Sequence, residues 1–597
     1  MTYLRKFGKI LLWALLAVLL LGLIATLAVR QPGVQTWLVG KVAGSLSERI
    51  GTEVRVDRVH FVFFRSLRVD DLFLADQSGD TLLAIGGLQA RIGLFSLFRK
   101  QLHLQITEVD QLKMYLRREA GQTDLNAQFL LSALAPEDRP AAPPSAGSGI
   151  RWDLQPGKIR FTDALLSLRD EVGGTDLEVQ LGECTLDIAR LDLNENLLHF
   201  AEVALHRTEI DYRQSASALP PSPDSSTLSF PDLGWRLLID HIDLAENRLY
   251  YDDQRQARQP GVLDPNHLQL DGIGLQARDL VWQPDRIELE LLQAALTDHS
   301  GLKLERLAGR LLLTPQQIAA SELRLQTGAS ELQTDLRLDF TALADLPDFL
   351  EKVKLESNPL RARLALDELW KCLPTLRTIP ELQFLRHDTV QLAGQLLVAG
   401  QAIETRSLEL EIPRRLALQG DLAFRALDQE PEYQLDLRRL EADYRFLHAL
   451  GLPPACDRGV LALQGQIEGP LASLNFRDLQ LRTLSGTAFR GHGRVLNLPD
   501  AAQLSYRLQI DELRTNAADL RCWAPAGLPA ELDSLGIIRF SGRTNGTTRE
   551  IELTGLWTTT PGRLSTDLSF SFPQLERPAS YEGNFRPCSA PSISSPW

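Results

Sequence analysis

The chain has 597 residues, several times the usual size of a domain, and a formal net charge of -14 at pH 7. Its 63 Lys and Arg residues are scattered rather than clustered, which argues against a nucleic-acid partner and leaves no electrostatic footprint for an anionic membrane surface. Composition does not shift in a way that would mark independent globular domains, so we expect one extended, repetitive architecture.

The first predicted element is a membrane anchor at residues 10–29. This uncharged stretch, rich in Leu, Ala and Val, is long enough as a helix to cross the roughly 30 Å hydrocarbon core of a bilayer. Arg5, Lys6 and Lys9 precede it, which predicts a cytoplasmic N-terminus at 1–9 and export of the rest. A cleavable signal peptide is the alternative. Residues 27–32 lack a small-x-small cleavage site, so we expect an uncleaved single-pass anchor.

An amphipathic helix is predicted directly after the anchor, at residues 32–50. Pro32 suits its start and Gly51 its end, and apolar residues recur at helical spacing along one face. Two interpretations remain open. The helix lies at the membrane surface or plugs the near end of a β structure, or it packs on the first strands as an ordinary amphipathic helix.

Beyond Gly51 the period of the sequence changes from helical to alternating. Segments such as 287–291, 336–340 and 433–437 place apolar residues on one face and charged residues on the other, which is typical of half-buried strands. Turn-forming residues such as those at 76–79 separate the segments, as an antiparallel meander requires. The candidate positions for a shared apolar face are Leu198, Phe200, Ile287, Leu289, Leu291, Leu336, Leu338, Leu435 and Leu437.

The strands repeat in blocks that read strand, turn, strand, turn, strand, as at 88–116, 185–212 and 273–291. Repeats of this kind add neighbours along one axis, so the sequence predicts an elongated sheet. Two Pro/Ser/Ala-rich stretches are predicted to be exposed loops. The expected division is a first β block at 51–134, a loop at 135–149, a second block at 150–213, a loop at 214–232, a third block at 233–344, a helical insertion at 345–375 that covers a sheet edge, further β repeats at 376–584, and an irregular tail at 585–597.

Nothing in the chain predicts an enzyme, a metal site or a cofactor. The nucleophile elbow, the zinc-binding helix motif, the phosphate-binding loop and the dinucleotide fingerprint are all absent. His241-Ile-Asp243 and Gly491-His-Gly493 are best explained as turn or strand-surface residues. The turn from Asp76 to Asp80 resembles a calcium loop but lacks the bidentate glutamate.

The five cysteines lie far apart and include no C-x-x-C pair. Neither a zinc site nor a dense disulfide framework follows, and the odd number leaves at least one thiol unpaired within the chain. We expect mostly isolated, buried thiols. The five are Cys184, Cys372, Cys456, Cys522 and Cys588.

An ordered set of short sequence motifs resembles the AsmA/TamB-like translocation and assembly module family, found in bacteria with two membranes. These motifs lie at 76–83, 94–104, 125–130, 463–469, 484–493, 497–500 and 559–568. The resemblance implies a mainly β fold: an N-terminal transmembrane helix, then a long antiparallel sheet curled into a taco-like trough, with a few short helices.

What the resemblance implies about function is phospholipid transport between the inner and outer membranes. The apolar strand positions named above would then face lipid, with the anchor in the inner membrane, the body in the periplasm and an outer-membrane barrel of the TamA type as partner. The alternative is an assembly or translocation factor for outer-membrane or secreted proteins, acting by strand pairing. A passive envelope spacer is the third hypothesis. Because the strand pattern stops after Asn584, we expect the partner-binding end of such a protein to be missing.

Overall fold

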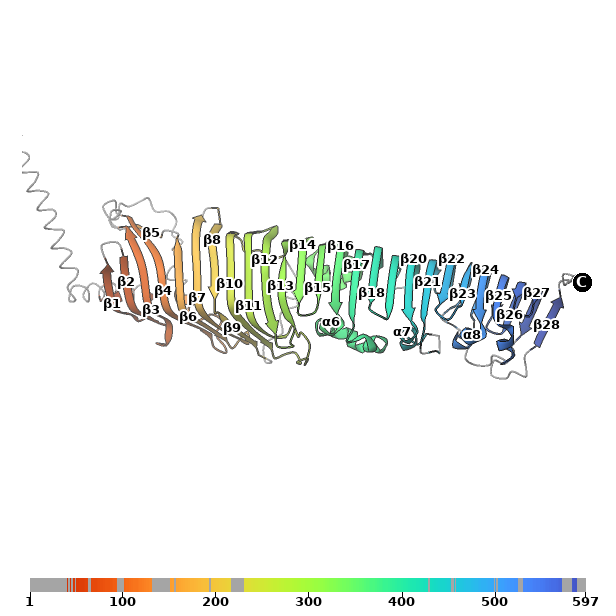
Figure 1. The fold of residues 1–597 in the computed structure, drawn as a ribbon. Coiled ribbons are helices and arrows are strands. Elements are labelled where there is room, and N and C mark those ends of the chain that lie inside the picture. The colour runs from red at the N-terminus through yellow and green to blue at the C-terminus, as the bar shows by residue number, and fades with distance from the viewer. Residues whose placement is uncertain are drawn as a thin grey trace, which may run out of the picture. The chain divides into compact units, whose positions relative to one another are not determined.

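The chain is mainly β, with a few short helices (Figure 1). The computed structural model describes residues 40, 43–44, 47–48, 50–62, 66–93, 101–130, 151–154, 157–192, 195–215, 230–427, 430–452, 456, 458–498, 500, 503–523, 530–571 and 582–587. It divides into two compact units: unit 1 is Met1–Thr227 with Pro231–Ala308, and unit 2 is Leu228–Phe230 with Gly309–Trp597. The chain thus has a structural division that its composition did not reveal.

Unit 1 is a mixed sheet. Its strands are β1 (Val54–Val62), β2 (Ser66–Ala75), β3 (Thr81–Gly93), β4 (Gln101–Arg118), β5 (Arg151–Leu154), β6 (Lys158–Asp170), β7 (Thr175–Asp192), β8 (Leu197–His206), β9 (Glu209–Gln214), β10 (Arg236–Asp253), β11 (His267–Gln283) and β12 (Arg286–Asp298). Most neighbours are antiparallel, but β4 pairs in parallel with β5 and β6, and β10 pairs in parallel with β8 and β9. The expected purely antiparallel sheet is therefore corrected to a mixed one.

The parallel pairs follow from the two long connections. A short hairpin can only reverse the chain, whereas a long connection can bring it back to start a strand in the same direction. The predicted loop at 135–149 lies between β4 and β5, and the predicted loop at 214–232, apart from its first residue, lies between β9 and β10. Residues 135–149 lie outside the described residues. Gln214, expected to begin the second loop, is instead the last residue of β9 and is buried.

In unit 2 the strands form an antiparallel meander from β14 onward. They are β14 (Gln317–Thr327), β15 (Glu331–Asp339), β16 (Lys354–Ala365), β17 (Thr389–Ala399), β18 (Ala402–Ile412), β19 (Leu416–Arg425), β20 (Glu432–Asp443), β21 (Val460–Pro470), β22 (Ser473–Thr483), β23 (Ala488–Leu496), β24 (Ser505–Asn516), β25 (Ile537–Thr547), β26 (Glu550–Thr558), β27 (Arg563–Ser571) and β28 (Glu582–Pro587). Strand β13 (Lys303–Thr314) runs across the residues at which the units divide. The expected irregular tail begins later than predicted, because 585–587 belong to β28.

A short helix recurs after every fourth strand of unit 2. Helix α6 (Leu366–Cys372) follows β16, α7 (Tyr444–Ala449) follows β20, and α8 (Ala517–Trp523) follows β24. Alternate strands of an antiparallel meander run in the same direction. These strands therefore all end at one edge of the sheet, where the three helices lie (Figure 1). The sequence did not reveal this four-strand period.

The predicted helical insertion at 345–375 is interrupted by a strand. Helical turns η2 (Leu343–Asp348) and α5 (Phe349–Lys352) come first, and α6 follows, with η3 (Pro374–Thr378) and η4 (Pro380–Leu385) beyond it. Between them lies β16, all of whose residues fall within the predicted insertion. Of the apolar residues that indicated a helix there, Leu366, Leu369 and Trp370 do lie in α6, but Leu364 belongs to β16. The ladder partners on β15 and β17 outweigh this local pattern.

β-Bulges cross the sheet of unit 2 at matching positions. Ser407 in β18 and Asp478 in β22 have positive φ angles of 50° and 48°. They lie opposite Gly394 and Gly465, where the backbones approach so closely that a Cβ on Gly465 would stand 2.8 Å from the Cα of Leu479. Because a bulge bends its strand and increases its twist, aligned bulges bend the sheet along a line across the strands.

The predicted anchor at 10–29 lies outside the described residues, and no helix within the described ranges is long and apolar enough to span a bilayer. The helix expected at 32–50 is described only at residues 40, 43, 44, 47, 48 and 50, all of which are helical. At its end, Ile50 packs against Val54, Leu74 and Leu82 of the first strands.

Candidate functional site on the apolar face

One face of unit 2 carries apolar rows that pass from strand to strand. Residues paired in a ladder place their side chains on the same face, so the register traces each row. One row, here called the unbroken row, contains apolar residues alone across β14 to β27. It comprises Leu325, Leu332, Ala362, Leu392, Leu410, Leu418, Leu440, Leu463, Leu481, Phe489, Leu513, Phe540, Trp557 and Leu564.

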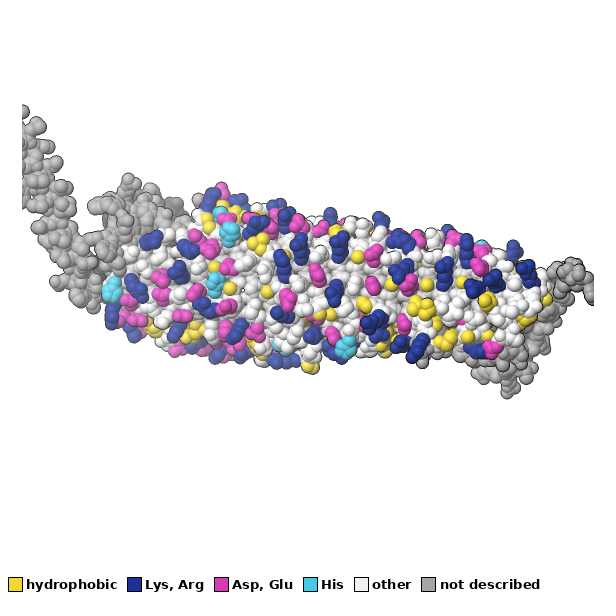
Figure 2. Space-filling view, in the orientation of Figure 1, with side chains coloured by type: hydrophobic (Ala, Val, Ile, Leu, Met, Phe, Trp, Pro, Cys, Tyr) yellow, Lys and Arg dark blue, Asp and Glu magenta, His cyan; other side chains and the backbone are white. Residues whose placement is uncertain are grey.

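The opposite face of the same strands is charged. Next to the unbroken row, the register aligns Gln333, Arg361, Ala393, Glu409, Gln419 and Arg439. Ion pairs join residues two apart along a strand, with Lys354 Nζ 2.6 Å from Glu356 Oε1. Figure 2 shows cationic and anionic side chains interspersed over the visible face. Each strand is therefore amphipathic, as its alternating sequence predicted.

Unit 1 has a comparable apolar row. It runs through Val59, Val69, Leu88, Val109, Phe161, Cys184, Leu205, Leu244, Leu275 and Ala294, from β1 to β12. Cys184 is buried in this row, and this burial raises the pKa of its thiol above the ordinary value. On the apolar face of unit 2, burial likewise raises the pKa of Tyr506.

The nine sequence-predicted positions all lie on these apolar faces. In unit 1, Leu198 aligns with Leu237, Trp282 and Ile287, while Leu291 pairs with Ala277. Phe200 pairs with Ile239, and Leu289 alternates with Ile287 and Leu291 along β12.

In unit 2, Leu336 and Leu435 occupy one row, with Ser357, Leu396, Thr405 and Leu422 between them. Leu338 pairs with Leu355, and Leu437 lies between Gly420 and Gly465. Leu437 is only 4% exposed and Leu291 only 5%, so these two are poor positions for ligand contact, whereas the other seven are half-buried. Reasoning from the sequence missed the unbroken row, because strand register is needed to align it.

Short helices cover one end of the apolar rows in unit 2. Tyr444, Phe446 and Leu447 of α7 are buried against Ile412 and Ala442 at the strand ends. Away from this edge, the strands described here contact mainly their ladder neighbours, and much of the apolar face is half-buried rather than sealed. The polar interruptions are small: the hydroxyls of Thr334 and Ser357 are 2.6 Å apart and bond to each other, whereas Thr566 Oγ1 and Trp557 Nε1 are buried without a hydrogen-bond partner among the described residues. The face is thus mostly apolar and partly accessible, and the unbroken row runs along it without a polar interruption.

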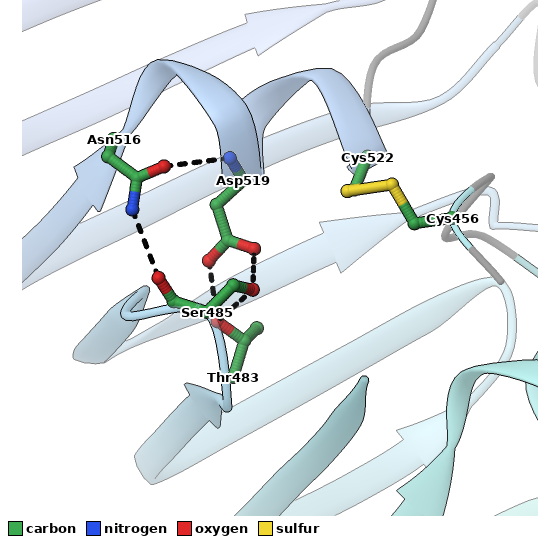
Figure 3. Close-up of a disulfide and its surroundings, with 6 residues drawn as sticks. All are labelled: Cys456, Thr483, Ser485, Asn516, Asp519 and Cys522. Carbon is green, nitrogen blue, oxygen red and sulfur yellow. Dashed lines mark hydrogen bonds between the residues drawn. A yellow bond between two sulfur atoms is a disulfide. The ribbon is translucent and has the colours of Figure 1, made fainter. Parts of the chain in front are cut away.

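A buried carboxylate fixes α8 to a distant turn (Figure 3). Asp519 is fully buried and accepts hydrogen bonds from Thr483 Oγ1 at 2.5 Å, from the Thr487 N–H at 2.9 Å and from the hydroxyl of Ser485. Burial alone would raise its pKa, but the hydrogen bonds from Ser485, Thr483 and Thr487 hold the pKa below the ordinary value. The carboxylate is therefore a structural support of the helical edge.

A disulfide corrects the expectation of mostly isolated thiols. Cys456, in the connection after α7, is bonded to Cys522 of α8 (Figure 3). The two cysteines are 66 residues apart in sequence, and the bond joins the connection that follows α7 to the next helix, α8. Cys184 is a buried free thiol, Cys372 is an exposed one, and Cys588 lies outside the described residues.

In the ranges that the structure describes, no group of His, Cys, Asp and Glu side chains could hold a metal ion. The turn from Asp76 to Asp80 is closed by its own side chain, because Asp76 Oδ1 accepts the N–H groups of Ser78 and Asp80, each at 2.9 Å. No protein-family model, curated protein or solved structure matches the chain.

Proposed function

We propose that the chain is an inner-membrane-anchored periplasmic protein that carries phospholipid between the inner and outer membranes along an apolar trough. The trough is the bent apolar face of the sheet, and an outer-membrane barrel of the TamA type is the proposed partner. The resemblance to the AsmA/TamB-like family motivates the membranes and the partner.

The observation that carries the proposal is the unbroken row of unit 2. An acyl chain lying along it would meet only apolar side chains from β14 to β27. Each methylene transferred from water to such a surface is stabilised by about 0.8 kcal/mol when it is fully buried, so a lipid tail would prefer the row strongly over water. A half-open face also lets a tail enter and leave, which a sealed core would prevent.

Two further features support the proposed location. Residues 10–29 have the length and hydropathy of a membrane span, preceded by basic residues. The Cys456–Cys522 disulfide suits an oxidising compartment such as the bacterial periplasm.

The test is photo-crosslinking in cells from paired positions on one strand. A photoreactive residue in place of half-buried Leu435 should capture phospholipid, whereas the same residue at exposed Gln434, on the opposite face of β20, should not. Leu435 is preferred to Leu437, which is almost completely buried. Mass spectrometry of the adducts identifies the captured molecule. Equal lipid capture at both positions, or none at Leu435, contradicts a lipid trough.

Strand pairing with a client protein is the second candidate function. Among the described residues, β28 pairs only with β27, and an unpaired edge presents backbone groups to which another strand can add. A photoreactive residue at Asn584 of β28 should then capture a client β segment, while Leu435 captures no lipid. Protein adducts at Asn584 alone would favour this function over lipid transport.

A further inference from the structure

The polar face of β22 to β27 gathers arginines that are far apart in the sequence. One ladder row aligns Arg482, Ala488, Arg514, Arg539, Thr558 and Arg563. Arg514 lies directly opposite Arg539, and Arg494 lies directly opposite Arg507. We call this surface, which also holds Arg490 and Arg543, the arginine face. Its acidic residues are fewer than its eight named arginines: they are Asp478, Asp511, Glu512, Glu550, Glu552 and Asp567.

Three central arginines of this face lack the ion pairs seen on neighbouring strands, whereas Arg477, on the same side of β22, lies 3.1 Å from Glu468. Within the described part of the chain, neither Arg507, Arg514 nor Arg539 forms an ion pair, and all three are exposed. By contrast, Arg439 on β20 lies 2.7 Å from Glu441, and Arg425 on β19 lies 2.8 Å from Glu404. Like charges directly opposite in a ladder destabilise a sheet, and bound anions would remove that repulsion.

Apolar side chains are exposed among these guanidinium groups. Ile537 and Leu556 are each 45% exposed. Leu556 pairs with Ser541, which places it between the rows of Arg539 and Arg543 on the same polar face. Ile537 is two residues from Arg539 along β25 and therefore also points to this face. The surface thus combines cationic groups with accessible apolar groups.

We propose that the arginine face docks on a membrane surface rich in anionic phospholipid. Guanidinium groups bind phosphate oxygens through paired hydrogen bonds, and exposed Ile and Leu side chains insert among the acyl chains below the headgroups. A soluble acidic polymer would use the arginines but would gain nothing from Ile537 and Leu556, so the apolar pair favours a membrane. The whole chain has a net charge of -14, which repels an anionic membrane. We therefore expect docking only through the arginine face.

This inference goes beyond the proposed trough, because it concerns the opposite face of the sheet. Lipid captured from Leu435 tests the trough, and vesicle binding through the arginine face tests the docking surface. The trough can therefore be disproved while the docking surface is confirmed, and the reverse.

The experiment measures binding of the full chain, held in phosphatidylcholine nanodiscs, to vesicles by flotation. The vesicles contain phosphatidylcholine alone or phosphatidylcholine mixed with phosphatidylglycerol. We expect binding to the mixed vesicles only, weakening as salt rises. Arg514→Glu with Arg539→Glu should weaken it about tenfold or more, since each arginine near an anionic surface contributes a several-fold effect. Ile537→Ser with Leu556→Ser should weaken it severalfold.

The matched control is Arg324→Glu with Arg361→Glu, two exposed arginines of the polar face of β14 to β16, which should bind as the wild type does. Arg507→Glu with Arg543→Glu is a second test of the face should the first pair disturb folding. Equal binding to both vesicle types, or wild-type binding by both charge-reversal variants, overturns the proposal. The proposal is also overturned if the Ile537→Ser, Leu556→Ser variant binds vesicles normally and soluble polyglutamate displaces them. The surface would then be a site for an acidic polymer.

Discussion

Units 1 and 2 fix their strand ends in different ways. In unit 1 the turns are closed from within: Asp170 accepts the N–H groups of Val172 at 3.1 Å and Gly173 at 2.9 Å. In unit 2 the carboxylates come from helices instead. Glu368 of α6 accepts a hydrogen bond from the Ala329 N–H at 3.1 Å and one from Ser330 Oγ at 2.6 Å, in the turn between β14 and β15.

This difference shows that the helices of unit 2 connect strands that are not neighbours. A turn closed by its own aspartate stabilises its own hairpin, and the ion pair of Asp170 with Arg118 extends this only to the adjacent strand β4. A helix that follows β24 and holds the turn between β22 and β23 ties strands two positions apart, and the disulfide from α8 reaches the connection after β20. Unit 2 should therefore lose stability over several strands when one edge contact is removed, whereas unit 1 should lose it locally.

The largest effect is expected on removal of the disulfide. Replacing Cys456→Ser together with Cys522→Ser should destabilise unit 2 by about 2–4 kcal/mol, because the unfolded chain regains the freedom of a long loop. Hydrogen exchange should show the loss of protection spread over β20 to β24. Cys372→Ser, at an exposed free thiol, is the control. Unchanged exchange in the double variant would show that the helices hold the edge without the disulfide.

Removal of the buried carboxylate should have the next largest effect. Asp519→Asn loses a charged acceptor of several hydrogen bonds and should cost about 2–3 kcal/mol. Exchange should rise both in α8 and in the turn at 483–487. The matched change in unit 1, Asp170→Asn, should raise exchange only near 171–174 and at its partner Arg118. Spread of the Asp170 effect to distant strands would remove the distinction between the units.

A smaller effect should be common to both units, because both contain bulges. Gly465→Ala in unit 2 forces a Cβ against backbone at a φ of +135° and should cost about 1–2 kcal/mol. Gly182→Ala in unit 1 places a Cβ 2.8 Å from the carbonyl oxygen of Arg207 and should be similarly destabilising. The measurement is thermal unfolding, and the control is Gly562→Ala, because a Cβ at Gly562 would meet no other atom. An unchanged unfolding temperature for Gly465→Ala would mean that the backbones at this bulge are not tightly packed.

The smallest and most gradual effect should come from acid. The pKa values of Asp170, in unit 1, and Asp519, in unit 2, are lowered, so each contributes stability above the ordinary carboxyl value of 3.8 and loses it as the pH falls through the lowered pKa. Asp519→Asn should reduce the dependence of stability on acid in β22 to β24 but leave that of unit 1 unchanged. Hydrogen exchange at low pH measures both. An identical acid response in the variant would exclude Asp519 as its source.

Local patterns predicted much of the secondary structure and both faces of the strands. The alternation at 433–437 became β20, with Leu435 and Leu437 on the apolar face. Prediction failed where long-range pairing overrides local spacing, as in β16, and where a long connection returns the chain in parallel, as before β5 and β10. The lipid-facing role of the nine positions stays a prediction.

The sequence by itself determined which side chains share a face, because alternation along a strand is local and has a fixed period of two. Only the tertiary structure decided which strands are neighbours and in which register. Register aligned the unbroken row, paired Cys456 with Cys522, and set Arg514 against Arg539. The scattered arginines therefore gave no sign in the sequence of the surface for which we propose membrane docking. Charges far apart along the chain act together only after the ladder brings adjacent strands to within about 5 Å.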